Sequence, residues 1–261
     1  MRYVRLIAVQ ARVSFLLLVQ YRLEAAISLL LAVFWTSSAL VPLLVLFSER
    51  TSVGGWSWGE ALLVVGWFNV LKGVQSIVIQ PSMNLAAEQV RKGTLDFVLL
   101  KPADAQLLVS AQRFDFRQLS DVLVGAVMLV YALAKLHVVP SPLALLVTAV
   151  ALVCGVAILY SIWVMVMSLA FVFVKVDNLT FLFQSIYDAA RWPGTIFRGV
   201  FAFVFTFVLP LTLMTTAPAL ALLGRLRGQE LLLSVVGAAL FLVMSRWVWT
   251  TCVARYTSAG G

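Results

Sequence analysis

Long runs of apolar residues, separated by short polar segments, dominate the sequence. Residues 25–47 contain 23 consecutive positions without a charged side chain. A helix rises about 1.5 Å per residue, so about 20 apolar residues cross the roughly 30 Å hydrocarbon core of a bilayer. The pattern therefore predicts an all-α integral membrane protein. Its six predicted spans cover approximately residues 25–47, 60–80, 118–138, 143–173, 200–219 and 231–251.

Two segments between these spans carry signals of their own. Pro81 is expected to end the second span, because proline breaks the hydrogen-bonded ladder of a helix. Residues 175–198 intersperse Asp177, Asp188 and Arg191 among apolar side chains. That mixture favours a surface helix or a re-entrant element over a further span.

The N-terminal residues 1–24 carry Arg2, Arg5 and Arg12 ahead of the first span. At 100° per helical residue the three arginines fall within an arc of about 80°, and apolar residues occupy the remaining surface. This is typical of an amphipathic helix at the cytoplasmic membrane interface; the alternative is a solvated leader. The first apolar run is too long for the core of a cleaved signal peptide, so we expect it to be retained.

The composition extends this picture to the whole chain. Of the 261 residues, 62% are hydrophobic and only 11% are charged, so we expect one membrane domain over residues 1–261. The net charge of +8 does not indicate nucleic-acid binding. Lys and Arg cluster between the apolar runs, where membrane lipid headgroups and the positive-inside rule account for them.

The distribution of basic residues predicts the orientation. With six spans, thirteen basic residues fall on the side of both termini and four on the other, which places both termini in the cytoplasm. Arg246, inside the last span, is expected to snorkel toward that interface. The larger group comprises Arg2, Arg5, Arg12, Arg22, Arg91, Lys92, Lys101, Arg113, Arg117, Lys175, Arg191, Arg198 and Arg255. The smaller group comprises Arg50, Lys135, Arg225 and Arg227.

Residues that could carry out catalysis are scarce. The sequence has two cysteines, Cys154 and Cys252, far apart, and one histidine, His137, which excludes a disulfide framework and an ordinary zinc or haem site. It also lacks a phosphate-binding loop, a serine nucleophile elbow and a zinc-protease motif. We therefore expect a non-catalytic chain.

A polar stripe follows the second predicted span. Asn69, Lys72, Ser76 and Gln80 fall within about 80° of helix surface. A charged Lys72 near mid-span costs about 2.5–3.5 kcal/mol against lipid, so it is expected to face protein or water. The stripe either lines a solute path or hydrogen-bonds a neighbouring helix, since polar side chains also serve packing in membranes.

The longest polar interruption, residues 81–117, surrounds an unexpectedly apolar centre. Leu95, Phe97, Val98, Leu99 and Leu100 follow one another almost without a break. Such an apolar surface is expected to pack against other groups and not to remain exposed to water. Either the protein's own helices or lipid headgroups cover it, or a partner protein binds there.

Three motifs resemble those of type 2 ABC exporter permeases. Residues 91–102, RKGTLDFVLLKP, resemble the "RxGxLDxxLLxP" cytoplasmic segment of the subgroup with a separate ATPase. Residues 191–197 resemble its "RYPxxIF" segment, with Trp192 in place of the tyrosine, and residues 209–219 resemble its "IPxxFxxxxPA" pattern. The motifs occur in the family's order and, with the six spans, cover nearly all of the chain.

This resemblance implies a function. It implies an N-terminal interface helix, a coupling helix between spans two and three that docks on an ATPase, and a substrate path lined by spans two and five between two permeases. The second permease would be a homologue or a copy of this chain. Two ATPase subunits would bind ATP and Mg²⁺, and this chain would hold no cofactor. The membrane would be the bacterial cytoplasmic membrane.

The resemblance also implies roles for particular residues. Those implied to contact the ATPase are Glu88, Arg91, Lys92, Gly93, Leu95, Asp96, Leu99 and Leu100. Those at helix-break and other family-pattern positions are Arg191, Pro193, Pro210 and Pro218. The residues themselves leave two other interpretations open: an ATP-independent channel or secondary transporter that uses Lys72, and a non-transporting assembly subunit.

Overall fold

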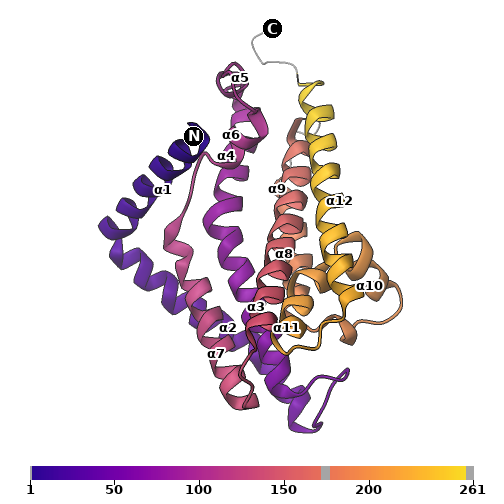
Figure 1. Cartoon of the computed structure of the whole chain (residues 1–261). Coiled ribbons are helices and arrows are strands. Elements are labelled where there is room, and N and C mark those ends of the chain that lie inside the picture. Colours follow the sequence, from indigo (N-terminus) through magenta and orange to yellow (C-terminus); the bar gives the residue numbers. More distant parts are fainter. Residues whose placement is uncertain (1, 172–176, 257–261) are drawn as a thin grey trace.

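The computed structural model describes residues 2–171 and 177–256, and these residues are mainly helical, with one isolated bridge between Val53 and Trp56. Most of the long helices stand side by side (Figure 1). The α-helices are α1 (Arg2–Gln20), α2 (Arg22–Ser48), α3 (Trp58–Val74), α4 (Gln80–Lys92), α5 (Asp96–Leu99), α6 (Ala105–Ser110), α7 (Leu119–Leu136), α8 (Pro142–Ser168), α9 (Asp177–Tyr187), α10 (Val200–Phe203), α11 (Ala217–Leu222) and α12 (Gly228–Val253).

Five helices in the described part of the chain are long and apolar enough to cross a membrane. They correspond to the predicted spans one, two, three, four and six. Their bounds, with adjoining helical turns included, are Arg22–Ser48, Trp58–Lys92, Phe116–Leu136, Pro142–Phe171 and Gly228–Val253.

The N-terminal segment forms a helix of its own. α1 ends at Gln20, the chain turns at Tyr21, and α1 and α2 meet in a V (Figure 1). The predicted helix therefore exists as a separate element. Its place at a membrane surface stays a prediction.

The second span continues through Pro81 to Lys92, so the prediction that Pro81 ends it is wrong. α3 passes through one π-helical turn, Gln75–Ile79, directly into α4. Proline cannot donate to the carbonyl four residues earlier, which here is that of Ile77. The backbone N–H of Asp115 donates to this oxygen instead, at 2.9 Å. The orphaned acceptor is thus satisfied from outside the helix, which continues as the α3–α4 helix.

The segment after α8 runs beside the α3–α4 helix toward the other end of the bundle, whereas the sequence favoured a surface helix or a re-entrant element over such a course. α9 continues in a 3-10 turn, Asp188–Arg191, and the chain then reaches Thr195. The Thr195 hydroxyl donates to the carbonyl of Gly54 and accepts from the indole N–H of Trp56, both at 2.9 Å. At its other end, α9 lines a cavity together with α4. The segment therefore runs antiparallel to the α3–α4 helix over most of its length.

The charges that favoured a surface element neutralise one another in the structure. The guanidinium of Arg191 pairs with the carboxylate of Asp188 at 2.9 Å and lies over the ring of Phe68, 5.2 Å from its centroid. A paired charge costs less to bury than an isolated one. The Asp188–Arg191 pair is therefore compatible with a place along the side of the bundle, where 54% of the Asp188 side chain and 25% of the Arg191 side chain stay exposed.

Residues 200–219, predicted as the fifth span, are not one continuous helix. After α10, a π-helical turn at Val204–Val208 ends at Leu209, and after Pro210 a second one, Thr212–Thr216, leads into α11. The residue before a proline is disfavoured in the α conformation. Leu209 accordingly adopts φ −123° and ψ 87°, and the helix breaks there.

These corrections change the predicted side of one stretch. Ile196 lies against Gly54, at the end of the bundle that carries residues 49–57, which we call the loop end. Arg198 follows two residues later, so it does not belong with the basic residues near the termini, and Arg191 lies within the bundle. Lys175 lies outside the described residues. Most of the predicted imbalance of basic residues is unaffected.

The α3–α4 helix is the centre of the bundle. In its most apolar stretch 72% of the residues are buried, against 17–39% in the four other long helices. Small residues let α7 approach it closely: a Cβ on Gly125 would lie 2.7 Å from the carbonyl oxygen of Gly66. At the opposite end from the loops, the main hydrophobic core continues into α5 and α6 through Leu95 and Leu108.

Candidate functional site

A cavity of about 680 Å³ lies between the α3–α4 helix, the start of α7, and α9. Lys72, Ser76 and Gln80 line it, three of the four residues of the predicted polar stripe. Most of its other lining side chains are polar too, among them Asn84, Glu88, Arg91, Arg113, Thr180 and Gln184. A space lined in this way holds water and hydrogen-bonding solutes better than apolar ones. We refer to it as the polar cavity.

Lys72 has a counter-ion that sequence reasoning missed. Its ammonium lies 3.4 Å from the carboxylate of Asp121 on α7, which is only 6% exposed. Asp121 stands in the first turn of α7, so the sequence suggested only a helix end. The signal was the glycine at position 73: a Cβ there would lie 2.8 Å from the backbone N of Val122, so the two helices touch beside the pair.

Asn69 lies apart from the other stripe residues and is buried. Its side-chain N–H donates to the Val65 carbonyl at 3.1 Å, and its side-chain oxygen accepts from the Thr36 hydroxyl at 3.3 Å. Asn69 therefore joins α2 to α3. It also lines, with Lys72 and Arg191, a smaller cavity of about 270 Å³ on the other side of Lys72.

The segment around α5 begins at a sharp turn. Gly93 ends α4 in the left-handed conformation, with φ 67°. The N–H of Thr94 donates to the Gln89 carbonyl at 2.9 Å, which satisfies an orphan acceptor at the helix end. We call residues 91–102 the docking segment. Its apolar side chains lie on two faces.

One of these faces is buried in the protein and the other is open. Leu95 and Val98 pack into the main core, whereas Phe97 is 71% and Leu100 81% exposed. Leu99 is half-buried. The protein's own helices therefore cover one part of the apolar centre and leave the other part uncovered; binding of a partner protein there stays a prediction.

The residues predicted to contact an ATPase differ in accessibility. Arg91, Lys92 and Leu100 are exposed, and Lys92 pairs with Glu88 at 2.5 Å, one helical turn away. Gly93, Asp96, Leu99 and Glu88 are half-buried. Leu95 is fully buried, so it supports the segment from beneath and offers no contact surface.

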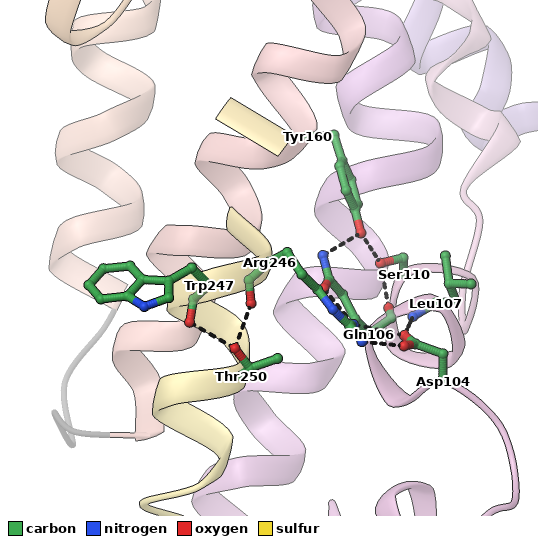
Figure 2. Close-up of polar contacts among 8 residues, drawn as sticks. All are labelled: Asp104, Gln106, Leu107, Ser110, Tyr160, Arg246, Trp247 and Thr250. Carbon is green, nitrogen blue, oxygen red and sulfur yellow. Dashed lines mark hydrogen bonds and ion pairs between the residues drawn. The ribbon is translucent and has the colours of Figure 1, made fainter. Parts of the chain in front are cut away.

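A polar network at α6 was not found from the sequence. The guanidinium of Arg246, on α12, donates to both carboxylate oxygens of Asp104, at 2.6 and 3.1 Å, and to the side-chain oxygen of Gln106 at 3.0 Å (Figure 2). The Gln106 amide donates to the hydroxyl of Tyr160 at 3.3 Å, and this hydroxyl lies 2.7 Å from that of Ser110. We call these five residues the Arg246 clamp.

The charge state of Asp104 follows from these contacts. Burial acts to raise the pKa of this carboxyl, but hydrogen bonds from Arg246 and from the backbone N–H of Leu107 outweigh it and hold the pKa below its usual value. Asp104 is therefore a carboxylate at neutral pH. Arg246 does not merely reach toward the interface, as its position in the last span suggested.

The family-pattern residues fall near the loop end and the middle of the bundle. Pro193 and Pro210 are buried, and Pro218 is buried in the first turn of α11. Next to Pro193, the N–H of Gly194 donates to the Thr216 hydroxyl at 3.2 Å. The segment after α9 and the broken helix before α11 are thus tied together.

Long apolar helices, a central helix with a polar face and a polar cavity beside it are features that membrane transport proteins share. Residues 33–260 match the family model described as "ABC-2 family transporter protein". The chain belongs to this family and is the membrane permease component of an ABC transporter. No curated protein and no solved structure matches the chain.

Proposed function

We propose that this chain is the permease subunit of an ATP-driven exporter in a bacterial cytoplasmic membrane. It moves a substrate from the cytoplasm outward, and two separate ATPase subunits bind ATP and Mg²⁺ and supply the energy. One observation carries the proposal. A single helix of 35 residues, roughly 52 Å long, joins Lys72, Ser76 and Gln80 in the polar cavity to the docking segment.

The docking segment supports binding of an ATPase. Phe97 and Leu100 are two large apolar side chains that water surrounds, next to the exposed Arg91 and Lys92. Apolar anchors with charged neighbours are typical of protein interfaces. A groove on the ATPase that holds Phe97 and Leu100 would push on α5 when the ATPase closes.

The wall of the polar cavity supports pairing with a second permease. α9 forms part of this wall and exposes Phe181 (72%) and Leu182 (53%). A homologous permease, or a second copy of this chain, packed on α9 would cover these side chains and enclose the cavity between two subunits. The substrate path then runs between α3–α4 and α9, and both chain termini lie in the cytoplasm.

Affinity purification in mild detergent, followed by mass spectrometry, tests the proposal. We expect a soluble ATPase and a second copy or second multispan protein to accompany the chain. Phe97→Asp with Leu100→Asp should lose the ATPase, whereas Val139→Asp, at an even more exposed position (92%) between α7 and α8, should keep it. Recovery without any nucleotide-binding subunit would contradict the proposal.

The Lys72–Asp121 pair favours a second candidate, an ATP-independent channel or secondary transporter. A paired lysine and aspartate beside a polar cavity is an arrangement that can respond to ions or protons. This candidate predicts solute or ion flux from the purified chain alone in liposomes, reduced by Lys72→Met. If the purified chain alone shows no flux and the complex with the ATPase does, this candidate is excluded.

A further inference from the structure

The last helix, α12, is attached to the segment that follows α5 by one strong polar contact. α12 packs mainly along α8. Near its end, Arg246 leaves this interface and holds Asp104 with two nitrogens of one guanidinium (Figure 2). Such a two-pronged pair fixes orientation as well as distance.

Asp104 cannot move independently of α6. It is the N-cap residue of this helix, and the oxygen Oδ1 that accepts from Arg246 also accepts from the N–H of Leu107 at 3.1 Å. N-capping side chains are held in place by the helix they begin. A displacement of α6 is therefore passed to Arg246, and through it to α12.

The rest of the Arg246 clamp is hydrogen-bonded consistently. The hydroxyl of Ser110 donates to the Gln106 carbonyl at 2.7 Å. The Tyr160 hydroxyl therefore donates to Ser110 and accepts from the Gln106 amide. Each polar side chain of the clamp therefore has a defined partner, although Arg246 and Asp104 are partly exposed.

The end of α12 packs on the turn that follows α8. Trp249 of α12 and Tyr256 both lie against the ring of Phe171, with ring centroids 5.6 and 5.5 Å apart. The Arg246 clamp is therefore the polar contact between α12 and α6, next to an aromatic contact with the α8 side.

We propose that Arg246 is a positioning residue that makes α4, α5, α6 and α12 move as one body when an ATPase pushes on the docking segment. The inference rests on the proposed function, because it needs that push. α3–α4 is continuous with the docking segment by covalent structure, whereas the Arg246 clamp ties α6 to α12 and, through Tyr160, to α8. α8 packs on the π-helical turn Gln75–Ile79 that carries Ser76, so without the clamp the push reaches this turn mainly through α4.

Cysteine accessibility in the polar cavity gives a test that needs no known substrate. In a Cys154→Ala, Cys252→Ala background, Ser76→Cys serves as a reporter, and a maleimide labels it in the purified complex without nucleotide and with ATP plus vanadate. We expect ATP to change the labelling rate about tenfold when the clamp is intact, a typical size for coupling between distant sites. Arg246→Gln should remove most of this change and still retain the ATPase.

Two further variants separate positioning from simple stabilisation. Asp104→Arg with Arg246→Asp should restore the response to ATP, because it rebuilds the pair with the charges exchanged. Asp104→Cys with Arg246→Cys, once cross-linked, should also respond, because the two sites move together. Arg225→Gln removes an ion pair with Glu60 at the loop end and serves as the control that keeps the response.

The outcomes distinguish the two proposals. An intact clamp with no response to ATP contradicts the proposed function itself. A full response in Arg246→Gln overturns the positioning role, and so does a cross-link that blocks the response. Loss of the ATPase from Arg246→Gln also overturns it, because the residue would then shape the docking surface.

Discussion

Two proline-containing regions of this protein, both predicted as simple spans, have different structures. The α3–α4 helix runs through Pro81 without a break, whereas the region 200–222 is divided at Pro210. At Pro81 the freed carbonyl of Ile77 receives the Asp115 N–H, at 2.9 Å. At Pro210 the preceding residue turns to an extended conformation, and the chain continues in a new helical turn. The α3–α4 helix thus continues through Pro81 at a place where a neighbouring segment supplies the missing donor.

The strongest test of the comparison concerns the packing of the two regions. Gly125→Leu puts a side chain where even a Cβ lies 2.7 Å from the backbone of α3, and backbone cannot shift cheaply. We expect a loss of at least about 3 kcal/mol of stability and little folded protein. Thermal unfolding of the detergent-purified protein measures the effect.

The matched control for that test lies on α12. Gly237→Ala meets only the flexible tip of Leu213, at 3.3 Å, in the divided region. Its effect should stay below about 1 kcal/mol, since alanine also favours helix. Equal destabilisation by Gly237→Ala and Gly125→Leu would show that the α3–α4 helix is not the more tightly packed region.

The charged pair on the central helix should give the next largest effect. Lys72→Met leaves Asp121 nearly buried without a counter-ion. We expect a loss of about 2 kcal/mol, less than for a fully buried pair because Lys72 is 36% exposed. Adding Asp121→Asn should recover most of the melting temperature. If Lys72→Met with Asp121→Asn is as unstable as Lys72→Met alone, the two side chains do not stabilise the protein as a charged pair.

The prolines themselves should give smaller, local effects. Pro81→Ala supplies an N–H to a carbonyl that already accepts a hydrogen bond. The gain and the loss of hydrogen-bond energy should nearly cancel, so we expect the stability to change by less than about 1 kcal/mol. Pro210→Ala releases the constraint on Leu209 and should speed amide hydrogen exchange across residues 200–222. Exchange measured by mass spectrometry should stay unchanged across residues 75–92 in Pro81→Ala. Faster exchange across residues 75–92 in Pro81→Ala, together with unchanged exchange across residues 200–222 in Pro210→Ala, would contradict the explanation given for the break.

The smallest effect is expected where the bundle meets water, at Asp104. Its pKa is held below the usual value, so the stabilisation is present above about pH 3.9 and is lost as the pH falls through the lowered pKa. Arg246→Gln should destabilise the protein at pH 7 by less than about 1 kcal/mol, since the pair is half-exposed. The melting temperature should fall accordingly. The difference in melting temperature between Arg246→Gln and the unaltered protein should become smaller at low pH. A difference that stays constant down to pH 3 would contradict the role of this carboxylate.

Length and hydropathy were sufficient to predict the long helices. Five of the six predicted spans have their counterpart, because a run of about 20 apolar residues has few other stable solutions. The fifth predicted span, residues 200–219, is not one continuous helix, because the helix breaks at Leu209 before Pro210. For residues 175–198 the prediction treated the charges one by one. Asp188 and Arg191 pair with each other, and no pattern along the chain reveals that a pair has formed.

The candidate site was predictable only where its residues lie on one helix. The spacing of Lys72, Ser76 and Gln80 was enough to place them on one face, and all three line the polar cavity. Asp121 and Arg246 depend on contacts between segments far apart in the sequence, at 49 and 142 residues from their partners. Such contacts follow from how the helices pack, which a single sequence does not state.

The contact of Thr195 with Gly54 and Trp56 has a practical consequence for labelling the protein. It ties the two connections at residues 49–57 and 192–196 into one structure, so an epitope tag inserted in either would pull both apart. Val139, between α7 and α8, is 92% exposed and belongs to a different connection. A tag placed there leaves the tied loops intact and allows an antibody to report, on unbroken cells, which side of the membrane the loop end faces.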